Sequence, residues 1–349
     1  MARVVRFAAP RAASVVDVED PVAEPGEVLL ETAYSGISAG TELTAYRGSN
    51  PYLSRIWDPE RRLFVTGGST QDYPLDGWGY EEVGRVVGVG STEDEDLLGC
   101  WVWGAWGHRS LAVRSSEYVR PRRLPGSGDV MVGVFAKIGA IALNAVLDAD
   151  IHVGETVVVF GAGVPGQITA QLARLNGARV VVVDPVESRR RLALQLGAVA
   201  ALDPAAEDVA EAVRAMTDDR GADVVIEMSG AYQALQEAAR TVGYSSRVVA
   251  AGFFQGDGVP LRLGEEFHHN RVAIVGSQIS GVAPQLQHRW DELRMSRTAL
   301  QLAAEGRLAL HPLVTHVLPD SEAPAAFEML DHGAQDALQV VLDYGTGHD

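Results

Sequence analysis

Residues Val157–Gly166 read VVVFGAGVPG, and this stretch decides the fold of the chain. The apolar residues at its start predict a buried strand, and the glycines that follow predict a tight turn into a helix. Gly161 would permit the turn, Gly163 would let backbone approach a ligand closely, and Gly166 would let the helix pack against the strand. Because helix N-termini attract anions, the pattern predicts a phosphate-binding turn.

A second strand with an acidic end extends this pattern. After a helix through Arg174, residues 178–183 form another mostly apolar run, which is followed by Asp184. An acid about 20 residues beyond the glycines is where the ribose 2′-hydroxyl of a dinucleotide finds an acceptor. An ordinary strand–helix–strand unit with a fortuitous loop is the alternative, but the glycines and the acid together favour a dinucleotide site.

The residues around the turn also predict which dinucleotide it binds. Asp184 would accept from the 2′-hydroxyl of NADH and repel the 2′-phosphate of NADPH, so we expect NADH to be preferred. Arg189, Arg190 or Arg191 could hold that phosphate instead, which leaves NADPH open. The residues expected to contact the cofactor are Gly161, Gly163, Val164, Pro165, Gly166, Asp184, Arg189, Ser229, Gly252 and Phe253.

Composition limits the partners of the chain. Its 349 residues are long for one core, and a hydrophobic content of 47% suffices for two packed domains. A formal net charge of −17 argues against nucleic acid or an anionic membrane and leaves a small-molecule substrate. Cys100 is the only cysteine, so an internal disulfide and a cysteine-rich zinc site are excluded, which suits the cytoplasm. Residues 130–147, interrupted by Lys137, are expected to form a buried helix rather than a membrane span.

The character of the chain changes along its length. The first third is mostly β, with runs such as residues 27–34 that predict strands. Residues 47–77 are rich in Pro, Gly and aromatic side chains, and are expected to form an irregular lid or substrate-lining excursion. A long helix over residues 129–149 then leads to the glycine-rich strand, and strands alternate with helices up to about residue 280.

Four motifs in this order resemble the medium-chain dehydrogenase/reductase superfamily over essentially the whole chain. They are Ser35-Gly36-Ile37, Gly79-x-Glu81-x-x-Gly84-x-Val86, Gly161-x-Gly163-x-x-Gly166 and the run Gly221–Glu227. The resemblance implies an α/β protein that joins a GroES-like β-barrel catalytic domain to a Rossmann domain, a doubly wound parallel sheet for the nicotinamide cofactor. The implied domains are residues 1–125 (catalytic) and 126–285 (Rossmann), with residues 286–349 returning to the catalytic domain.

Two further stretches resemble a subgroup of that superfamily. Residues 37–43 and the block from His268 to Gly281 are similar to bacteriochlorophyllide dehydrogenase-like proteins and to cyclitol reductases of aminocyclitol antibiotic pathways. The resemblance, together with an apolar strand over Arg271–Ser277 at the expected edge of the sheet, also predicts a homodimer.

The chain departs from the zinc-dependent members of that superfamily. They place a cysteine after Ser-Gly-Ile and a histidine before the glutamate of the second motif, where this chain has Ser38 (or Ala39) and Tyr80. A third ligand would fall near Lys137. Zinc needs thiolate, imidazole or carboxylate ligands, and Glu81 alone cannot hold it, so no zinc is expected.

Without a metal, hydrogen-bond donors must stabilise negative charge on the substrate oxygen. The resemblance places Thr41 where relatives carry a relay hydroxyl, with helix capping as an equal alternative. Tyr80 would point into the cleft between the domains, where it could donate its phenol proton or only fill the volume of the missing metal. Glu81 is expected to orient its neighbours. Trp106 and His108 could line the cleft, although such a histidine is more often packed.

Lys137 is the sharpest candidate for a general acid. It is the only lysine in a chain whose lysines and arginines total 29, and it lies at the expected mouth of the cleft in an apolar segment. Burial there would favour release of its proton near neutral pH, which an arginine cannot provide. The alternative is chance retention, with the amine reaching water.

These features predict a zinc-independent, NAD(P)H-dependent reductase. We expect hydride transfer to a conjugated enone (C=C) or a ketone on a small cyclic polyhydroxylated, cyclitol-like substrate of secondary metabolism. Plain alcohol–ketone interconversion of the bacteriochlorophyllide dehydrogenase type is one alternative. A cofactor-binding relative without catalysis is the other, and the intact glycine turn disfavours it.

Overall fold

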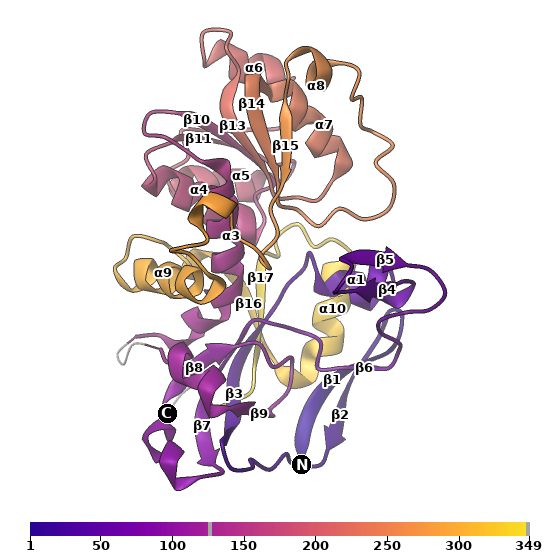
Figure 1. Cartoon of the computed structure of the whole chain (residues 1–349), viewed down its shortest axis with the longest axis vertical. Coiled ribbons are helices and arrows are strands. Elements are labelled where there is room, and N and C mark those ends of the chain that lie inside the picture. Colours follow the sequence, from indigo (N-terminus) through magenta and orange to yellow (C-terminus); the bar gives the residue numbers. More distant parts are fainter. Residues whose placement is uncertain (125–127, 347–349) are drawn as a thin grey trace. The chain divides into compact units, whose positions relative to one another are not determined.

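The structure is a computed structural model that describes residues 1–124 and 128–346. The chain forms two compact units, the first from Met1–Lys137 with Val314–Asp349 and the second from Ile138–Leu313 (Figure 1). The return to the first unit therefore comes at residue 314 rather than at the predicted residue 286. Helix α9 (Glu292–Ala304) stays with the second unit, since a Cβ on Gly139 would lie 2.6 Å from that of Ala299.

The second unit contains a six-stranded parallel sheet in the order β12-β11-β10-β13-β14-β15. Its strands are β10 (Thr156–Phe160), β11 (Arg179–Val183), β12 (Ala200–Leu202), β13 (Ala222–Glu227), β14 (Val242–Ala250) and β15 (Ala273–Gly276). Val158 pairs with both Val181 and Val225, so these valines lie side by side at the centre of the sheet. The Rossmann prediction is confirmed, and β15 is the edge strand as expected.

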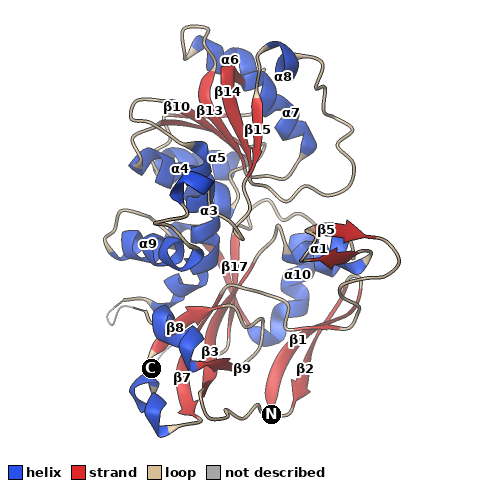
Figure 2. Cartoon of the chain, viewed as in Figure 1, coloured by secondary structure: helices blue, strands red, loops and turns tan. Residues whose placement is uncertain are grey.

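Helices cover this sheet because its strands are apolar on both faces. The helices of the second unit include α3 (Ala136–Ala149, which starts in the first unit), α4 (Val164–Leu175), α5 (Glu187–Gln195), α6 (Val209–Ala215), α7 (Tyr232–Thr241) and α8 (Glu266–His269). Val213 of α6 and Leu235 of α7 join one buried cluster with Val158 and the alternate residues of neighbouring strands. Figure 2 shows the helices grouped around the sheet.

The predicted helix over residues 129–149 is present in two parts. A 3-10 helix, η4 (Val130–Phe135), runs directly into α3. Among the described residues, the combined segment is the one helix long and apolar enough to cross a membrane by length and composition. Its most apolar window is 67% buried inside the fold, which is the pattern of a core helix.

The described residues of the first unit form two larger sheets and one two-stranded sheet. Of the two larger sheets, one has the order β16-β17-β3-β7-β8, with β9 also paired to β3, and the other has the order β2-β1-β6. The strands are β1 (Ala2–Ala9), β2 (Ala12–Val18), β3 (Glu27–Ile37), β6 (Leu75–Asp76), β7 (Glu82–Val89), β8 (Trp101–Gly104), β9 (Leu111–Ser115), β16 (Val314–Pro319) and β17 (Gln339–Asp343). Strand β17 pairs with β3, so the C-terminal residues complete a sheet begun at residue 27.

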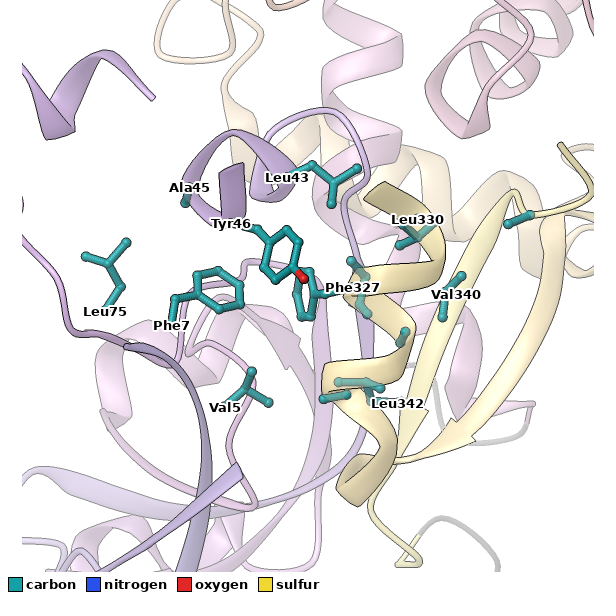
Figure 3. Packing of buried hydrophobic residues seen from close by; sticks show 14 of the residues in the cluster. Val5, Phe7, Leu43, Ala45, Tyr46, Leu75, Phe327, Leu330, Val340 and Leu342 are labelled. Atoms are coloured by element: carbon teal, nitrogen blue, oxygen red, sulfur yellow. The ribbon is translucent and has the colours of Figure 1, made fainter. Parts of the chain in front are cut away.

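A cluster of aromatic rings fixes the short helix α1 (Glu42–Arg47) in this unit (Figure 3). The ring of Phe327, on α10 (Ala323–Asp331), lies 4.9 Å from that of Phe7 and 5.6 Å from that of Tyr46, measured between centroids. Replacing such a buried phenylalanine by alanine costs about 3–5 kcal/mol of stability. The cluster thereby ties α1, which begins beside the candidate site, to the C-terminal helix.

The excursion over residues 47–77 is less irregular than predicted. It contains a 3-10 turn, η1 (Pro51–Leu53), and a two-stranded hairpin of β4 (Ile56–Asp58) and β5 (Leu63–Val65). The rings of Trp57 and Phe64 lie 4.9 Å apart across this hairpin. Cross-strand aromatic contact of this kind stabilises short hairpins. The two strands are too short to show an alternating pattern in the sequence, so the hairpin was not predicted.

Candidate active site

Three hydroxyl groups meet where β3 ends and β7 begins. Ser35 pairs with Glu82 in the antiparallel ladder between these strands, so Ser38 and Tyr80 lie just beyond the paired residues and face each other. The Ser38 Oγ and Tyr80 Oη atoms are 2.5 Å apart, and Tyr80 Oη lies 3.3 Å from Thr41 Oγ1. The register of one strand pair thus creates the hydroxyl cluster, defined here as Ser38, Thr41 and Tyr80.

The hydrogen bonds of the hydroxyl cluster have a consistent direction. Tyr80 donates to Thr41, which leaves Ser38 to donate to the phenol oxygen. Burial is the main cause that raises the pKa of Tyr80 above its ordinary value, so the phenol keeps its proton at neutral pH. Tyr80 is therefore a protonated phenol that donates one hydrogen bond and accepts another from the Ser38 hydroxyl.

Thr41 was predicted to be either a relay hydroxyl or a helix cap. It occupies the position before α1, but its side chain makes no capping hydrogen bond. Its Oγ1 accepts from Tyr80 instead, so the capping interpretation is wrong.

Glu81 lies beside the hydroxyl cluster, where it is almost fully buried (1% exposed). Burial first, and then the Glu42 and Glu82 carboxylates, raise the pKa of Glu81 well above its ordinary value, which favours the protonated form. A Cβ on Gly36 would lie 2.6 Å from Glu81 Oε2, which explains the glycine of the Ser-Gly-Ile motif. This Oε2 atom has no hydrogen-bond partner among the described residues, and the orienting role of Glu81 stays a prediction.

Trp106 and His108 do not line an open surface. Their exposed fractions are 2% and 0%, and both side chains are used inside the fold. Trp106 donates from Nε1 to Thr32 Oγ1 at 2.9 Å, and His108 Nε2 lies 2.6 Å from Glu42 Oε2. The histidine–glutamate pair was not anticipated, because its partners are 66 residues apart and no local pattern joins them.

Lys137 is the second residue of α3. Its side chain is half-buried between two buried neighbours, Ala136 and Ile138. This placement fits a lysine in an otherwise apolar segment, and its role as a general acid stays a prediction.

The glycine turn has the geometry that the sequence predicts. Gly161 has a φ of +90°, and a Cβ there would lie 2.9 Å from the backbone nitrogen of Ser229. A Cβ on Gly166 would lie only 1.8 Å from the carbonyl oxygen of Gly161, so α4 can approach the turn only with glycine at this position. A Cβ on Gly163 would instead meet only Cδ of Pro165, at an ordinary contact distance of 3.9 Å. The turn thus leaves room for a ligand at Gly163, directly before Val164 and Pro165 at the start of α4.

Asp184 lies beside the glycine turn and holds it in place through hydrogen bonds. Its Oδ2 accepts from the backbone N–H of Ala162 at 2.7 Å, and its Oδ1 accepts from Val186 at 2.8 Å. The residue is 4% exposed. Because each carboxylate oxygen has a second lone-pair direction, both atoms keep the capacity to accept from a ribose hydroxyl.

The three arginines after Asp184 differ in what they contact. Arg190 donates to the Asp184 carbonyl at 2.7 Å and pairs with Asp203 at 2.9 Å, so it is committed inside the fold. Arg191 is exposed and lies 3.6 Å from Glu187. Arg189 is half-buried, and its carbonyl accepts from Gln167 at 2.9 Å.

The remaining predicted cofactor residues lie where β13 and β14 end. Glu227, the last residue of β13, accepts from the backbone of Ser229 at 2.8 Å and of Gly230 at 3.0 Å. A Cβ on Gly252 would lie 2.1 Å from the Gly230 nitrogen, so these two loops touch. Phe253, beside Gly252, is 42% exposed. Glu227 was missed as a loop organiser, although an acid at the end of a buried strand was the available signal.

Comparison with known proteins supports the class that this geometry indicates. A family described as zinc-binding dehydrogenase matches residues 163–297. The D-guloside 3-dehydrogenase of Escherichia coli is 29% identical over 344 residues, covering 96% of this chain and 98% of that protein. The L-threonine 3-dehydrogenase of Pyrococcus furiosus is 27% identical over 342 residues, covering 92% of each chain.

Solved structures agree on the fold. The 2R,3R-butanediol dehydrogenase of Bacillus subtilis superposes with a TM-score of 0.80 at 20% identity, covering 98% of this chain and 99% of that one. A Sinorhizobium meliloti protein bound to NADP has a TM-score of 0.77 at 24% identity over the same shares. The class is therefore that of NAD(P)-dependent oxidoreductases. Within it, the chain is similar to zinc-binding dehydrogenases over residues 163–297 and to the two dehydrogenases named above over nearly its whole length.

The residues that stand in the metal-ligand positions of the resemblance do not suit zinc. Ser38 and Tyr80 are hydroxyls hydrogen-bonded to each other, and burial raises the pKa of the Glu81 carboxyl, which disfavours the ionised form that zinc prefers. Among residues 1–124 and 128–346, no group of three His, Cys, Asp or Glu side chains is arranged to hold a metal ion. Because zinc prefers thiolate, imidazole and ionised carboxylate ligands, this donor set does not fit a catalytic zinc ion.

Proposed function

We propose that the chain is a zinc-independent, NAD(P)H-dependent reductase that acts on a ring ketone of a small cyclic polyhydroxylated substrate. The observation that carries the proposal is the hydroxyl cluster, in which Tyr80 holds a proton between Ser38 and Thr41. A relative that is 29% identical over nearly the whole chain is named as a dehydrogenase of a sugar derivative, which supports a polyhydroxylated substrate.

The residues of the first unit would manage the oxygen of the substrate. When bound, the nicotinamide cofactor supplies a hydride to the carbonyl carbon. Tyr80 would donate a hydrogen bond to the carbonyl oxygen, which takes the C–O π electron pair and becomes an alkoxide. Tyr80 would then transfer its proton to this oxygen, which becomes a hydroxyl. Ser38 would donate a hydrogen bond to the resulting phenolate until the phenol regains its proton from solvent, and Thr41 would accept from the phenol in the resting state.

The residues of the second unit would hold the cofactor. The turn at Gly163 and the N-terminus of α4 would take the pyrophosphate, and the Asp184 carboxylate would accept from the adenosine ribose. We propose a preference for NADH, which kcat/KM values for NADH and NADPH test directly. A tenfold preference for NADPH would show that Arg189 or Arg191 outweighs Asp184.

Reduction of a conjugated enone is a second candidate. The same phenol would stabilise an enolate oxygen while hydride goes to the β-carbon, and Lys137 would then protonate the α-carbon. Lys137 is half-buried at the start of α3, in keeping with a buried general acid.

A substrate panel distinguishes the candidates. Oxidation of NADH and NADPH would be followed with keto-inositols, keto-glycosides and cyclic enones, and the reverse reaction with inositols and glycosides. We expect turnover of a keto-cyclitol or keto-glycoside. Turnover of enones alone would favour the second candidate, and binding of cofactor with no turnover of any ketone, enone or polyol would favour a non-catalytic relative.

The assembly and location of the protein are also proposed. The edge strand β15 is only half-buried and has unpaired backbone groups on one side, so a second copy could extend the sheet into a homodimer. Sedimentation at micromolar concentration would test this, and a monomer would refute it. We further propose a cytoplasmic enzyme of secondary metabolism.

A further inference from the structure

Two hydrogen bonds from one residue close the loop that carries Ser38 and Thr41 of the hydroxyl cluster. Glu42, the first residue of α1, accepts from the backbone N–H of Ser38 through Oε1 at 3.0 Å. Its own N–H donates to the Ser38 carbonyl at 2.9 Å. Ser38 and Thr41 therefore lie on a short loop whose two ends are joined by the side chain and backbone of Glu42.

The second oxygen of Glu42 is held by His108. Glu42 Oε2 lies 2.6 Å from His108 Nε2, and His108 Nδ1 lies 2.8 Å from Ser35 Oγ. Tyr344 Oη approaches Ser35 Oγ at 3.4 Å. Glu42, His108 and Ser35 are 0% exposed, so the carboxylate has no other position available to it. The arrangement joins the end of β3, the start of α1 and the segment after β8.

The charges around this pair explain why a histidine is present. Burial disfavours a charged imidazole, but the Glu42 carboxylate and the hydrogen bond it accepts outweigh burial and raise the pKa of His108. Glu82 also faces the histidine, and Arg109 in turn faces Glu82. His108 is thus the partner that allows the Glu42 carboxylate to be buried beside two further acids, Glu81 and Glu82.

We propose that Glu42, locked by His108, is a positioning residue that holds the Ser38 and Thr41 hydroxyls around the phenol of Tyr80. The inference rests on the proposed function and deepens it, because a proton donor works only when it is held within about 0.5 Å of its productive position. The feature that matters is the reach of the side chain, which spans from the Ser38 N–H to the imidazole.

Two substitutions separate reach from charge. Glu42→Gln keeps the length: its amide oxygen accepts from the Ser38 N–H, and its NH₂ donates to Nε2 of a neutral His108, whose Nδ1–H then donates to Ser35. Glu42→Asp keeps the charge but is shorter by one methylene and cannot bridge both partners. We expect Glu42→Asp to lower kcat about 10- to 100-fold with the KM for NADH unchanged, and Glu42→Gln to stay within about threefold of the parent. The reverse order, with aspartate active and glutamine impaired, would overturn the proposal.

A second measurement does not depend on the substrate. Hydrogen exchange of a peptide covering residues 37–43 should lose protection in Glu42→Asp and keep it in Glu42→Gln. Equal protection in both variants and the parent would overturn the proposal even if no substrate is turned over. If protection follows the prediction but no ketone or enone reacts, the proposed function fails and the positioning role stands.

A matched control excludes a general loss of stability. Asp94 is a buried carboxylate of the same unit (6% exposed) that pairs with Arg120 at 2.9 Å. Asp94→Asn should lower the melting temperature without changing kcat or the exchange of residues 37–43. A fall in kcat for this control as large as for Glu42→Asp would show that destabilisation alone explains the effect.

Discussion

Replacing Tyr80 by phenylalanine removes one oxygen from the hydroxyl cluster and leaves the ring in place. The phenol is the group that donates to Thr41 and accepts from Ser38, so both of these hydroxyls lose their partner. Loss of a general acid lowers rates by about 10²–10⁴-fold, which corresponds to about 3–5 kcal/mol of transition-state stabilisation. The unpaired hydroxyls should cost about 1 kcal/mol of folding stability, since partly buried groups can find other partners.

The assay is steady-state reduction of the best ketone from the panel, with NADH oxidation followed by absorbance. We expect kcat to fall by about two or more orders of magnitude while the dissociation constant for NADH stays unchanged. Tyr73→Phe is the matched control, because that phenol donates to the Ala45 carbonyl of the same unit, outside the hydroxyl cluster. Parent-like kcat in Tyr80→Phe, or an equal loss in Tyr73→Phe, would refute the assignment of Tyr80 as proton donor.

Three further predictions follow from named side chains. Lys137→Ala should lower turnover of an enone by about two orders of magnitude, and Lys137→Arg nearly as much if proton release matters; parent-like rates in both would make Lys137 a bystander. Gly166→Ala should lower both the melting temperature and NADH affinity, because its Cβ would meet the Gly161 carbonyl at 1.8 Å. Gly163→Ala should weaken NADH binding with little change in melting temperature. A destabilised Gly163→Ala beside a parent-like melting temperature in Gly166→Ala would contradict the turn geometry. The raised pKa of Glu81 means that the folded state binds more protons than the unfolded state above pH 4.5, so its contribution to stability falls as pH rises. Glu81→Gln should therefore raise the melting temperature at pH 8 and lose that advantage toward pH 4.5; a pH-independent difference would contradict the assignment.

Local sequence patterns were enough to predict the Rossmann fold of the second unit. The glycine turn, the strand before it and the acid after it obey rules that act over a few residues, and Gly161 and Gly166 have the predicted geometry. The edge position of β15 was also predictable from an apolar run at the end of the alternating pattern. Strand β12 was missed because three residues, Ala200–Leu202, are too short to show a period.

Long-range pairing was not predictable in the same way. The boundary at residue 314 depends on β17 pairing with β3, some 300 residues earlier, so the predicted boundary at 286 assigned α9 to the wrong unit. The hydroxyl cluster depends on the register of β3 with β7, and capping was a plausible local role for Thr41 that tertiary contact overrode. The pairing of His108 with Glu42 likewise exists only in the folded chain.

The central claim is that hydrogen-bond donors replace a metal in a chain whose relatives include zinc-binding dehydrogenases. The most direct test is metal analysis of protein purified without chelator, combined with kcat before and after exhaustive dialysis against a zinc chelator. The account predicts no stoichiometric zinc and an unchanged kcat, because the hydroxyls of Ser38 and Tyr80 with the single carboxyl of Glu81 offer no suitable ligand set. One zinc ion per chain, with activity lost on chelation and restored by added zinc, would contradict it.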